Sequence, residues 1–292
     1  MLTEPSRSSP GAEATQSAVD RHFDQSSAFW DELYGGTDVY SAIHRRRQQL
    51  ALAWIDELGP PGHGRALELG CGAGLTAIAL ARRGWQVHAT DTVESMLARA
   101  RTNAAAAGVA DRITFGLADA QRLTFGDASF DLVLALGVIP WLELPAQALS
   151  EMARVTRTGG VVVANVDNRG RLDYAMDPRR NPHLAPARRV VKALLHRATT
   201  AAGAPSRLHA IAELDAMLAA AGVEKRRGAA YGFGPFTLLG RRALPDGVGV
   251  RLDRFLQQRV DAGSPALARH GAQYLVLGDR RPGAAASTAP SA

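Results

Sequence analysis

The chain of 292 residues is 46% hydrophobic and 21% charged, which is enough to bury one large core or two modest ones. It contains no apolar run of about 18 residues and no signal-peptide pattern, so we expect no membrane-spanning helix and a cytoplasmic location. Its single cysteine, Cys71, excludes an internal disulfide.

The net charge of +6 is unevenly distributed along the chain. Residues 168–207 hold nine Lys or Arg against two Asp, a net charge of +7, which leaves −1 for the rest. Because this basic segment lacks an aromatic stacking motif, we expect no nucleic-acid partner. The two ends, residues 1–18 and 281–292, are rich in Ser, Pro, Gly and Ala and are predicted to be disordered tails.

Residues 19–60 are predicted to form an N-terminal helical cap. Its aromatic residues include Tyr34 and Tyr40, which are candidate walls of a substrate pocket. Two interpretations stay open: the segment covers a ligand site, or it packs on a sheet as an ordinary amphipathic helix whose wet face is residues 45–47.

A glycine-rich turn follows the first predicted strand. Residues 65–69 form an apolar strand that carries Glu68 and leads into Gly70, Gly72 and Gly74. Such glycines permit tight backbone angles and let a ligand approach the main chain closely. The helix that follows offers unpaired N–H groups to an anionic group, so this turn is the predicted cofactor site.

The turn fits two classes of nucleotide cofactor. Its last two glycines and Ala77 match the relaxed G-x-G-x-x-A fingerprint of NAD(P) sites, which leaves an oxidoreductase open. Glu68 lies on the strand itself, where a dinucleotide has no need of a carboxylate but S-adenosylmethionine needs polar partners. Glu68 therefore favours S-adenosylmethionine over NAD(P).

The following strands continue the pattern. Residues 85–90 form the second strand, which ends at Asp91 about 20 residues after the turn, the spacing of a ribose-binding carboxylate. Asp91 is equally suited to cap the helix predicted over residues 93–107. The third strand, residues 112–118, is followed by Asp119. Further strands are predicted at residues 130–136, 160–166, 223–233 and 273–277, and a further helix at residues 208–221.

These motifs, in this order over residues 65–166, resemble those of class I S-adenosylmethionine-dependent methyltransferases. The resemblance implies that the glycine turn passes beneath the methionine part of the cofactor, that Asp91 binds the ribose hydroxyls, and that Asp119 lies near the adenine amino group. It also implies that the last strand is inserted antiparallel. The predicted cofactor-binding residues are Glu68, Gly70, Cys71, Gly72, Gly74, Asp91, Thr92, Asp119, Ala120, Leu136 and Gly137.

The predicted fold is therefore α/β: a Rossmann-like, doubly wound, seven-stranded and mostly parallel sheet. The methyltransferase domain spans residues 61–280, with a basic helical insertion at 168–207 after the fifth strand. Residues 186–198 form a cationic amphipathic helix within that insertion. Three interpretations of this helix stay open: it packs on the domain, it forms a lid, or it makes weak contact with an anionic membrane surface.

The wider layout resembles the O-methyltransferases of ubiquinone biosynthesis, through residues 165–170 and 231–240. Those enzymes carry Glu and His after the fourth strand, whereas this chain has Pro140 and Trp141, so we expect no metal site. Residues 233–270 contain apolar side chains that could roof a pocket or complete the core. The candidate roof residues are Phe233, Phe236, Leu238, Leu239, Phe255 and Leu256.

The expected activity is transfer of a methyl group by in-line displacement to a small, apolar or aromatic, hydroxylated molecule. A non-catalytic methyltransferase-like binding protein is the alternative outside enzymes. The sequence assigns no catalytic residue; the candidates are His44, His183 and His209, with Trp141 as a further pocket wall. The identity of the acceptor and the oligomeric state are left open.

Overall fold

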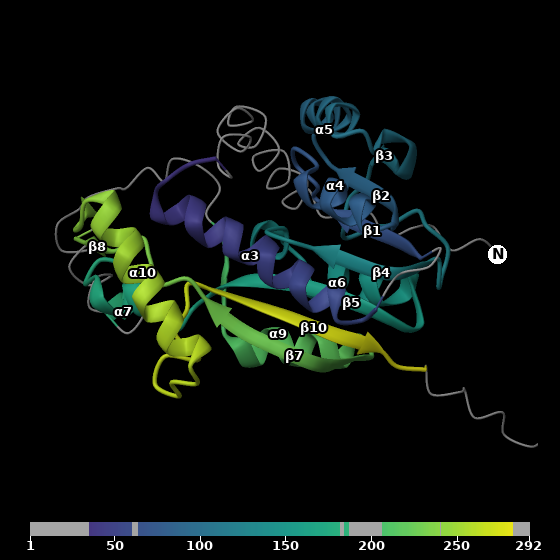
Figure 1. Ribbon diagram of the computed structural model, residues 1–292. Helices are drawn as coiled ribbons and strands as arrows, with labels where there is room; N and C mark the ends of the chain where they lie inside the picture. Colours follow the sequence, from purple (N-terminus) through teal and green to yellow (C-terminus); the bar gives the residue numbers. More distant parts are fainter. Residues whose placement is uncertain (1–34, 60–63, 182–183, 187–205, 240, 283–292) are drawn as a thin grey trace, which may run out of the picture.

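The computed structural model describes residues 35–59, 64–181, 184–186, 206–239 and 241–282 (Figure 1). The predicted N-terminal tail, Tyr34, His183 and residues 187–198 of the basic helix lie outside the described residues. Within the described ranges, no helix is both long and apolar enough to cross a membrane. The domain boundaries predicted from the sequence stay predictions.

An eight-stranded sheet forms the centre of the structure, in the order β3-β2-β1-β4-β5-β10-β7, with β6 paired to β5. All pairs are parallel except those of β10, which runs antiparallel to both β5 and β7. The predicted fold class and the antiparallel last strand are confirmed. The predicted number of seven strands is one too low, because the short β6 pairs with the end of β5. The strands are β1 Arg65–Leu69, β2 Gln86–Asp91, β3 Ile113–Leu117, β4 Phe130–Ala135, β5 Thr156–Asn168, β6 Leu208–His209, β7 Val223–Tyr231 and β10 Gln273–Arg280.

Helices flank the sheet. The longer ones are α3 Val39–Asp56, α4 Leu75–Arg82, α5 Glu94–Ala106, α6 Pro145–Val155, α9 Ile211–Ala220 and α10 Asp246–Asp261. Short elements are η1 Ala110–Arg112, η2 Ile139–Trp141, α7 Leu172–Met176, β8 Thr237–Leu238 and β9 Arg241–Arg242. Several predicted boundaries differ from the structure. The strand predicted at residues 160–166 begins at Thr156, and the strand predicted at residues 223–233 ends at Tyr231. The helix expected from Leu208 begins at Ile211, because Leu208 and His209 pair with the end of β5 instead.

The two faces of the sheet bury two separate cores. Because successive side chains of a strand point to opposite faces, Leu132 and Leu134 of β4 join the core beneath α3, α4 and α5, whereas Val133 and Ala135 join the core beneath α6 and α9. Figure 1 shows α3 crossing one face of the sheet, with α9 behind β10 and β7. This two-sided covering is typical of doubly wound parallel sheets.

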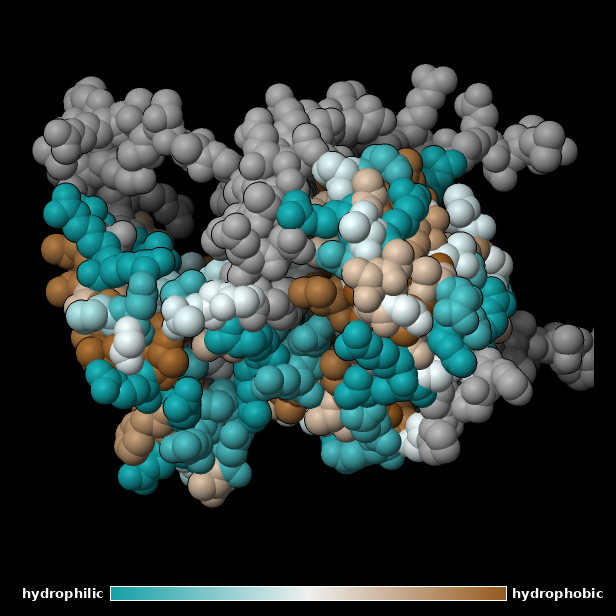
Figure 2. Space-filling model, turned by 45° about the horizontal axis from the view of Figure 1, so that its top comes forward, coloured by the Kyte–Doolittle hydropathy of each residue, from teal (hydrophilic) through white to brown (hydrophobic). Residues whose placement is uncertain are grey.

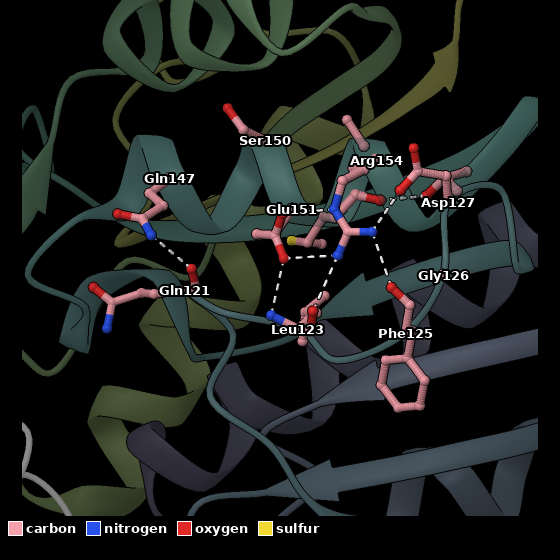
Figure 3. A network of polar contacts seen from close by, with 12 residues as sticks. Gln121, Leu123, Phe125, Gly126, Asp127, Gln147, Ser150, Glu151 and Arg154 are labelled. Carbon is pink, nitrogen blue, oxygen red and sulfur yellow. Dashed lines mark hydrogen bonds and ion pairs between the residues drawn. The ribbon is translucent and has the colours of Figure 1, made fainter. Parts of the chain in front are cut away.

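Arg154 of α6 joins that helix to the loop before β4. Its guanidinium donates to Glu151 and Asp127 and to the carbonyl oxygens of Leu123 and Phe125, at 2.6 to 3.1 Å (Figure 3). Hydrogen bonds to the two carboxylates raise the pKa of Arg154. The network fixes the connection between β3 and β4, which carries part of the site described below.

The predicted apolar pocket roof is not formed by the residues proposed for it. Leu238, Leu239 and Phe255 are about half exposed, whereas Phe233 is fully buried in the protein interior. Figure 2 shows apolar surface at the end of the molecule formed by α7, β8 and α10. These side chains therefore contribute to the surface or the core.

Candidate functional site

A cavity of about 340 Å³ opens at the carboxyl ends of the parallel strands. The strand order reverses between β1 and β4, and ligands of doubly wound sheets bind at such a reversal. The structure brings ten of the eleven predicted cofactor residues to the cavity wall; their role in binding stays a prediction. The ten are Glu68, Gly70, Cys71, Gly72, Asp91, Thr92, Asp119, Ala120, Leu136 and Gly137.

The exception is Gly74, which does not line the cavity. It precedes α4 with a φ of +79°, and a Cβ there would lie 2.9 Å from the Cβ of Ala100 on α5. Its glycine is thus required by close helix packing and by the backbone rather than by a ligand. The sequence alone could not distinguish a glycine required by helix packing from one required by a ligand in the same turn.

Asp91 fixes the glycine turn. Its Oδ2 accepts the backbone N–H of Gly72 at 2.9 Å, and its Oδ1 accepts that of Val93 at 3.0 Å, at the start of α5. Gly72 has a φ of +52°, and a Cβ there would have no atom within 4 Å. This turn is therefore held in shape by Asp91 and faces open space on the ligand side. Asp91 is not the N-cap of α5, which is Val93; it binds the N–H of that residue while it lines the cavity.

Glu68 presents a buried carboxyl group to the same cavity. Its side chain is 3% exposed, and within the described residues its Oε2 has no hydrogen-bond partner. Burial raises the pKa of Glu68 to about 8, although the N–H of Ala77 and the hydroxyl of Thr76 oppose the shift. A buried acceptor without a donor is costly, so Glu68 is suited to receive an ammonium group from a ligand.

Arg47 is a site residue that sequence analysis missed. The expectation that residues 45–47 form a wet helix face is wrong for Arg47, which is buried and lines the cavity. Its guanidinium packs against the backbone of Gly137, where a Cβ would lie 2.5 Å from Nη1. A guanidinium beside the glycine turn could hold a ligand carboxylate.

Asp119 follows β3 and lines the cavity on the side of the predicted cofactor residues. Its Oδ1 accepts the backbone N–H of Gln121 at 2.8 Å, which holds the loop, and the neighbouring Ala120 is buried. Both residues face the cavity. The carboxylate of Asp119 can therefore accept a hydrogen bond from the base of a nucleoside.

The candidate catalytic histidines separate in space. His44 lines the cavity; its Nδ1 donates to the carbonyl of Tyr40 at 2.9 Å, since a carbonyl only accepts. Burial and the charge of Arg47 lower the pKa of His44 to about 3, so the ring stays neutral at physiological pH. His209 does not line the cavity and lies 3.8 Å from Glu213. His183 lies outside the described residues.

The far half of the cavity is aromatic and charged. Tyr40 and Trp141 line it as predicted for pocket walls, and burial raises the pKa of Tyr40 to about 12. Arg171, Tyr174 and Asp167 also line it and were not singled out individually. The Arg171 guanidinium makes a bidentate pair with Asp173 and lies 4.4 Å from the centre of the Tyr174 ring. The apolar side chains predicted from residues 233–270 are absent from the described lining, which takes Gly234 and Pro235 instead.

The residues present fit S-adenosylmethionine as the cofactor. The unpartnered Oε2 of Glu68 and the buried Arg47 are complementary to an amino acid moiety, and the open turn at Gly72 admits a bulky group. Asp91 and Asp119 provide acceptors farther along for a ribose and a base. Among the described residues, no group of three or more His, Cys, Asp or Glu side chains is placed to hold a metal ion.

Fold and cavity thus define a doubly wound α/β protein with a nucleotide-type site. Residues 67–164 match the family model described as a methyltransferase domain. This segment therefore forms a methyltransferase domain of the class I S-adenosylmethionine-dependent family, as the resemblance predicts.

Curated relatives are similar to part of this chain, and a solved structure shares its fold. The chain is 35% identical over 121 residues to the ubiquinone biosynthesis O-methyltransferase of Paracidovorax citrulli, covering 41% of this chain and 50% of that relative. It is 34% identical over 151 residues to the tRNA 5-carboxymethoxyuridine methyltransferase of Escherichia coli, covering 49% and 55%. The structure of magnesium protoporphyrin IX methyltransferase from Synechocystis superposes with a TM-score of 0.60 at 17% identity, covering 91% of this chain and 99% of that one.

The chain spans about half the length of the curated relatives it matches. The shared segment contains the cofactor side of the cavity, whereas the far half comes mainly from outside the matched residues 67–164. Because one relative acts on tRNA by name, the expectation of no nucleic-acid partner is not supported.

Proposed function

We propose that the protein transfers a methyl group from S-adenosylmethionine to a small hydroxylated acceptor of apolar or aromatic character. The observation that carries the proposal is one continuous cavity joining the glycine turn to an aromatic wall of Tyr40, Trp141 and Tyr174. When bound, the cofactor supplies an activated sulfonium methyl group.

Four charged or ionisable residues on the cofactor side have roles in this proposal. Glu68 accepts from the ammonium of the methionine moiety, Arg47 binds its carboxylate, and Asp91 accepts from the ribose hydroxyls. Asp119 accepts from the adenine amino group. The aromatic wall excludes water and orients the acceptor for in-line attack, which supplies much of the acceleration.

Calorimetric titration with S-adenosylhomocysteine tests the cofactor assignment. We expect the wild type to bind it and Asp91→Ala to bind about 100-fold more weakly, because hydrogen bonds to a charged acceptor contribute about 1.5 to 3 kcal/mol each. Asp111→Ala, a change at an exposed aspartate before β3, is the matched control and should bind like the wild type. Unchanged affinity in folded Asp91→Ala, or preferential binding of NADH, would reject the proposal.

Release of S-adenosylhomocysteine in the presence of candidate acceptors tests the substrate class. The panel contains hydroxylated aromatics, hydroxylated lipids, small polar amines and tRNA, the last because of the tRNA-modifying relative. We expect turnover with members of the first two groups. Turnover confined to tRNA or to amines would contradict the proposed acceptor class. Cofactor binding without turnover across all four groups would favour a non-catalytic binding protein.

A further inference from the structure

Four hydrogen bonds of fixed direction end at the acceptor half of the cavity. The N–H of Gly137 donates to Asn165 Oδ1 at 2.6 Å, so the Asn165 amide nitrogen is left to donate toward Gln273 Oε1, at a long 3.5 Å. The Tyr231 hydroxyl donates to the same Oε1 at 2.7 Å. Because its oxygen receives both donors, Gln273 turns its amide nitrogen to Asp167 and donates to Oδ1 at 3.1 Å.

The sheet register places this chain of side chains on one face. Gln273 of β10 is paired with Asp167 of β5 on one side and with Tyr231 of β7 on the other. Tyr231 and Gln273 are buried, whereas Asp167 is half-buried and lines the cavity. Asp167 lies two residues beyond Asn165, so it stands about 7 Å farther along β5 than the residue that holds the Gly137 peptide.

The hydrogen bond from Gln273 therefore orients the Asp167 carboxylate and occupies its Oδ1. In the part of the chain that the structure describes, its Oδ2 receives no hydrogen bond. Asp167 is half-buried and lines the cavity, so this oxygen is open to it. An ionised carboxylate only accepts, so the partner that suits it is an O–H or N–H donor in the cavity. The charged or titratable groups that face Asp167 are Tyr40, Arg171 and His209. Burial raises the pKa of Tyr40 to about 12, so its hydroxyl keeps its proton, and Arg171 is paired with Asp173. Among the described residues, neither side chain donates a hydrogen bond to Asp167.

We propose that Asp167 is a catalytic residue that receives the hydrogen bond of the acceptor hydroxyl and takes its proton during methyl transfer. This inference rests on the proposed function. The acceptor oxygen forms the new O–C bond, the C–S bond breaks with its electron pair passing to sulfur, and the sulfonium becomes a thioether. The O–H electrons stay on oxygen, and the proton moves to Oδ2. An oxygen that has gained a methyl group while keeping its proton is strongly acidic, so a carboxylate suffices as the base.

The same geometry makes Gln273 a positioning residue. Its N–H holds Asp167 at Oδ1 and leaves Oδ2 toward the cavity. The Tyr231 hydroxyl in turn fixes which end of the Gln273 amide faces Asp167. Through Asn165, the arrangement is tied to the Gly137 peptide, which is a predicted cofactor contact.

A chromophoric phenol tests this role without turnover. 4-Nitrophenol is titrated with pH in the presence of protein saturated with S-adenosylhomocysteine, and the absorbance of its phenolate gives the apparent pKa of the bound probe. A neighbouring carboxylate disfavours phenolate, so we expect the wild type to hold this pKa about 1 to 3 units above that in Asp167→Asn. Asp111→Asn, the same change at an exposed site, should match the wild type.

Equal probe pKa values in the wild type and folded Asp167→Asn would overturn the inference, and so would failure of the loaded wild type to bind the phenol. If Asp167→Asn does not fold, Asp167→Ser removes the same charge and is held to the same expectation. For any phenol that the wild type methylates, kcat should fall about 100-fold or more in the neutral variant. Absence of S-adenosylhomocysteine binding to the wild type would instead refute the proposed function, so the two failures are distinguishable.

Discussion

Replacement of Glu68 by Gln should change how the stability of the ligand-free protein depends on pH. In the folded protein, burial raises the pKa of Glu68 from the ordinary 4.5 to about 8. Between these values the folded state keeps a proton that the unfolded chain has released. Stability from this group is therefore fully present below about pH 4.5 and is lost as the pH rises through about 8. A glutamine side chain cannot ionise, so the variant should lack this loss.

The size of the effect follows from linkage. One pKa unit corresponds to about 1.4 kcal/mol, so between about pH 5 and about pH 8.5 the wild type should lose about 4 kcal/mol relative to Glu68→Gln. Relaxation or water entry around the carboxylate would reduce the figure. Its sign follows from burial, which outweighs the Ala77 N–H and the Thr76 hydroxyl that favour the charged form of Glu68.

Urea unfolding at closely spaced pH values provides the measurement, with Glu94→Gln as a control at an exposed glutamate of α5. The free energy of unfolding of Glu68→Gln minus that of the wild type should increase with pH, whereas the control should follow the wild type. Saturation with S-adenosylhomocysteine should reduce the loss of wild-type stability with rising pH, because a ligand ammonium stabilises the ionised Glu68 carboxylate. Parallel pH profiles for the wild type and Glu68→Gln would refute the reasoning.

Three further outcomes are expected. Gly74→Ala should lower the free energy of unfolding by about 2 kcal/mol in urea titrations, because its φ is +79° and its Cβ would meet Ala100. Gly72→Ala, with open space around its Cβ, should instead weaken binding of S-adenosylhomocysteine in calorimetry more than Gly74→Ala does. Arg154→Met should cost about 1 to 3 kcal/mol in the same urea assay, since two backbone carbonyls and two carboxylates lose a donor. The free energy of unfolding of His44→Gln should be less sensitive to acid than that of the wild type in the same urea assay. Because the pKa of folded His44 is lowered from 6.5 to about 3, the wild type loses stability as the pH falls below about 6.5. The loss should reach about 2 kcal/mol near pH 5.

Much of the fold could be predicted because its determinants are local. The strand with Glu68 and the glycine turn after it are both recognisable within about ten residues of sequence. Apolar runs separated by segments of helical periodicity indicate a parallel sheet. The cofactor side follows the carboxyl ends of successive strands, so chain order alone brings Asp91 and Asp119 to one edge. Boundary errors arose where a tertiary contact overrides propensity, as at Leu208, which joins β5 instead of α9.

Arg47 could not be predicted in this way. Its neighbours in sequence are Arg45 and Arg46, and the run of three basic residues is typical of a solvated helix face. Only the packing of α3 against the sheet turns Arg47 inward, to the backbone of Gly137, while Arg46 forms an exposed ion pair with Asp261 of α10. A helical wheel drawn with period 3.6 does separate residues 46 and 47 by about 100°, which is the one signal that could have distinguished them.

The acceptor half depends on a still longer-range feature, the register of β10. Because β10 enters the sheet antiparallel between β5 and β7, Gln273 is paired with Asp167 and with Tyr231 at once. A shift of one residue would place Tyr274 opposite Asp167 and turn Gln273 to the other face of the sheet. The last strand, although it lies outside the family match at residues 67–164, therefore decides how the carboxylate of Asp167 is presented to the cavity. Relatives that share the cofactor half but differ in this pairing would be expected to share the cofactor while treating the acceptor differently.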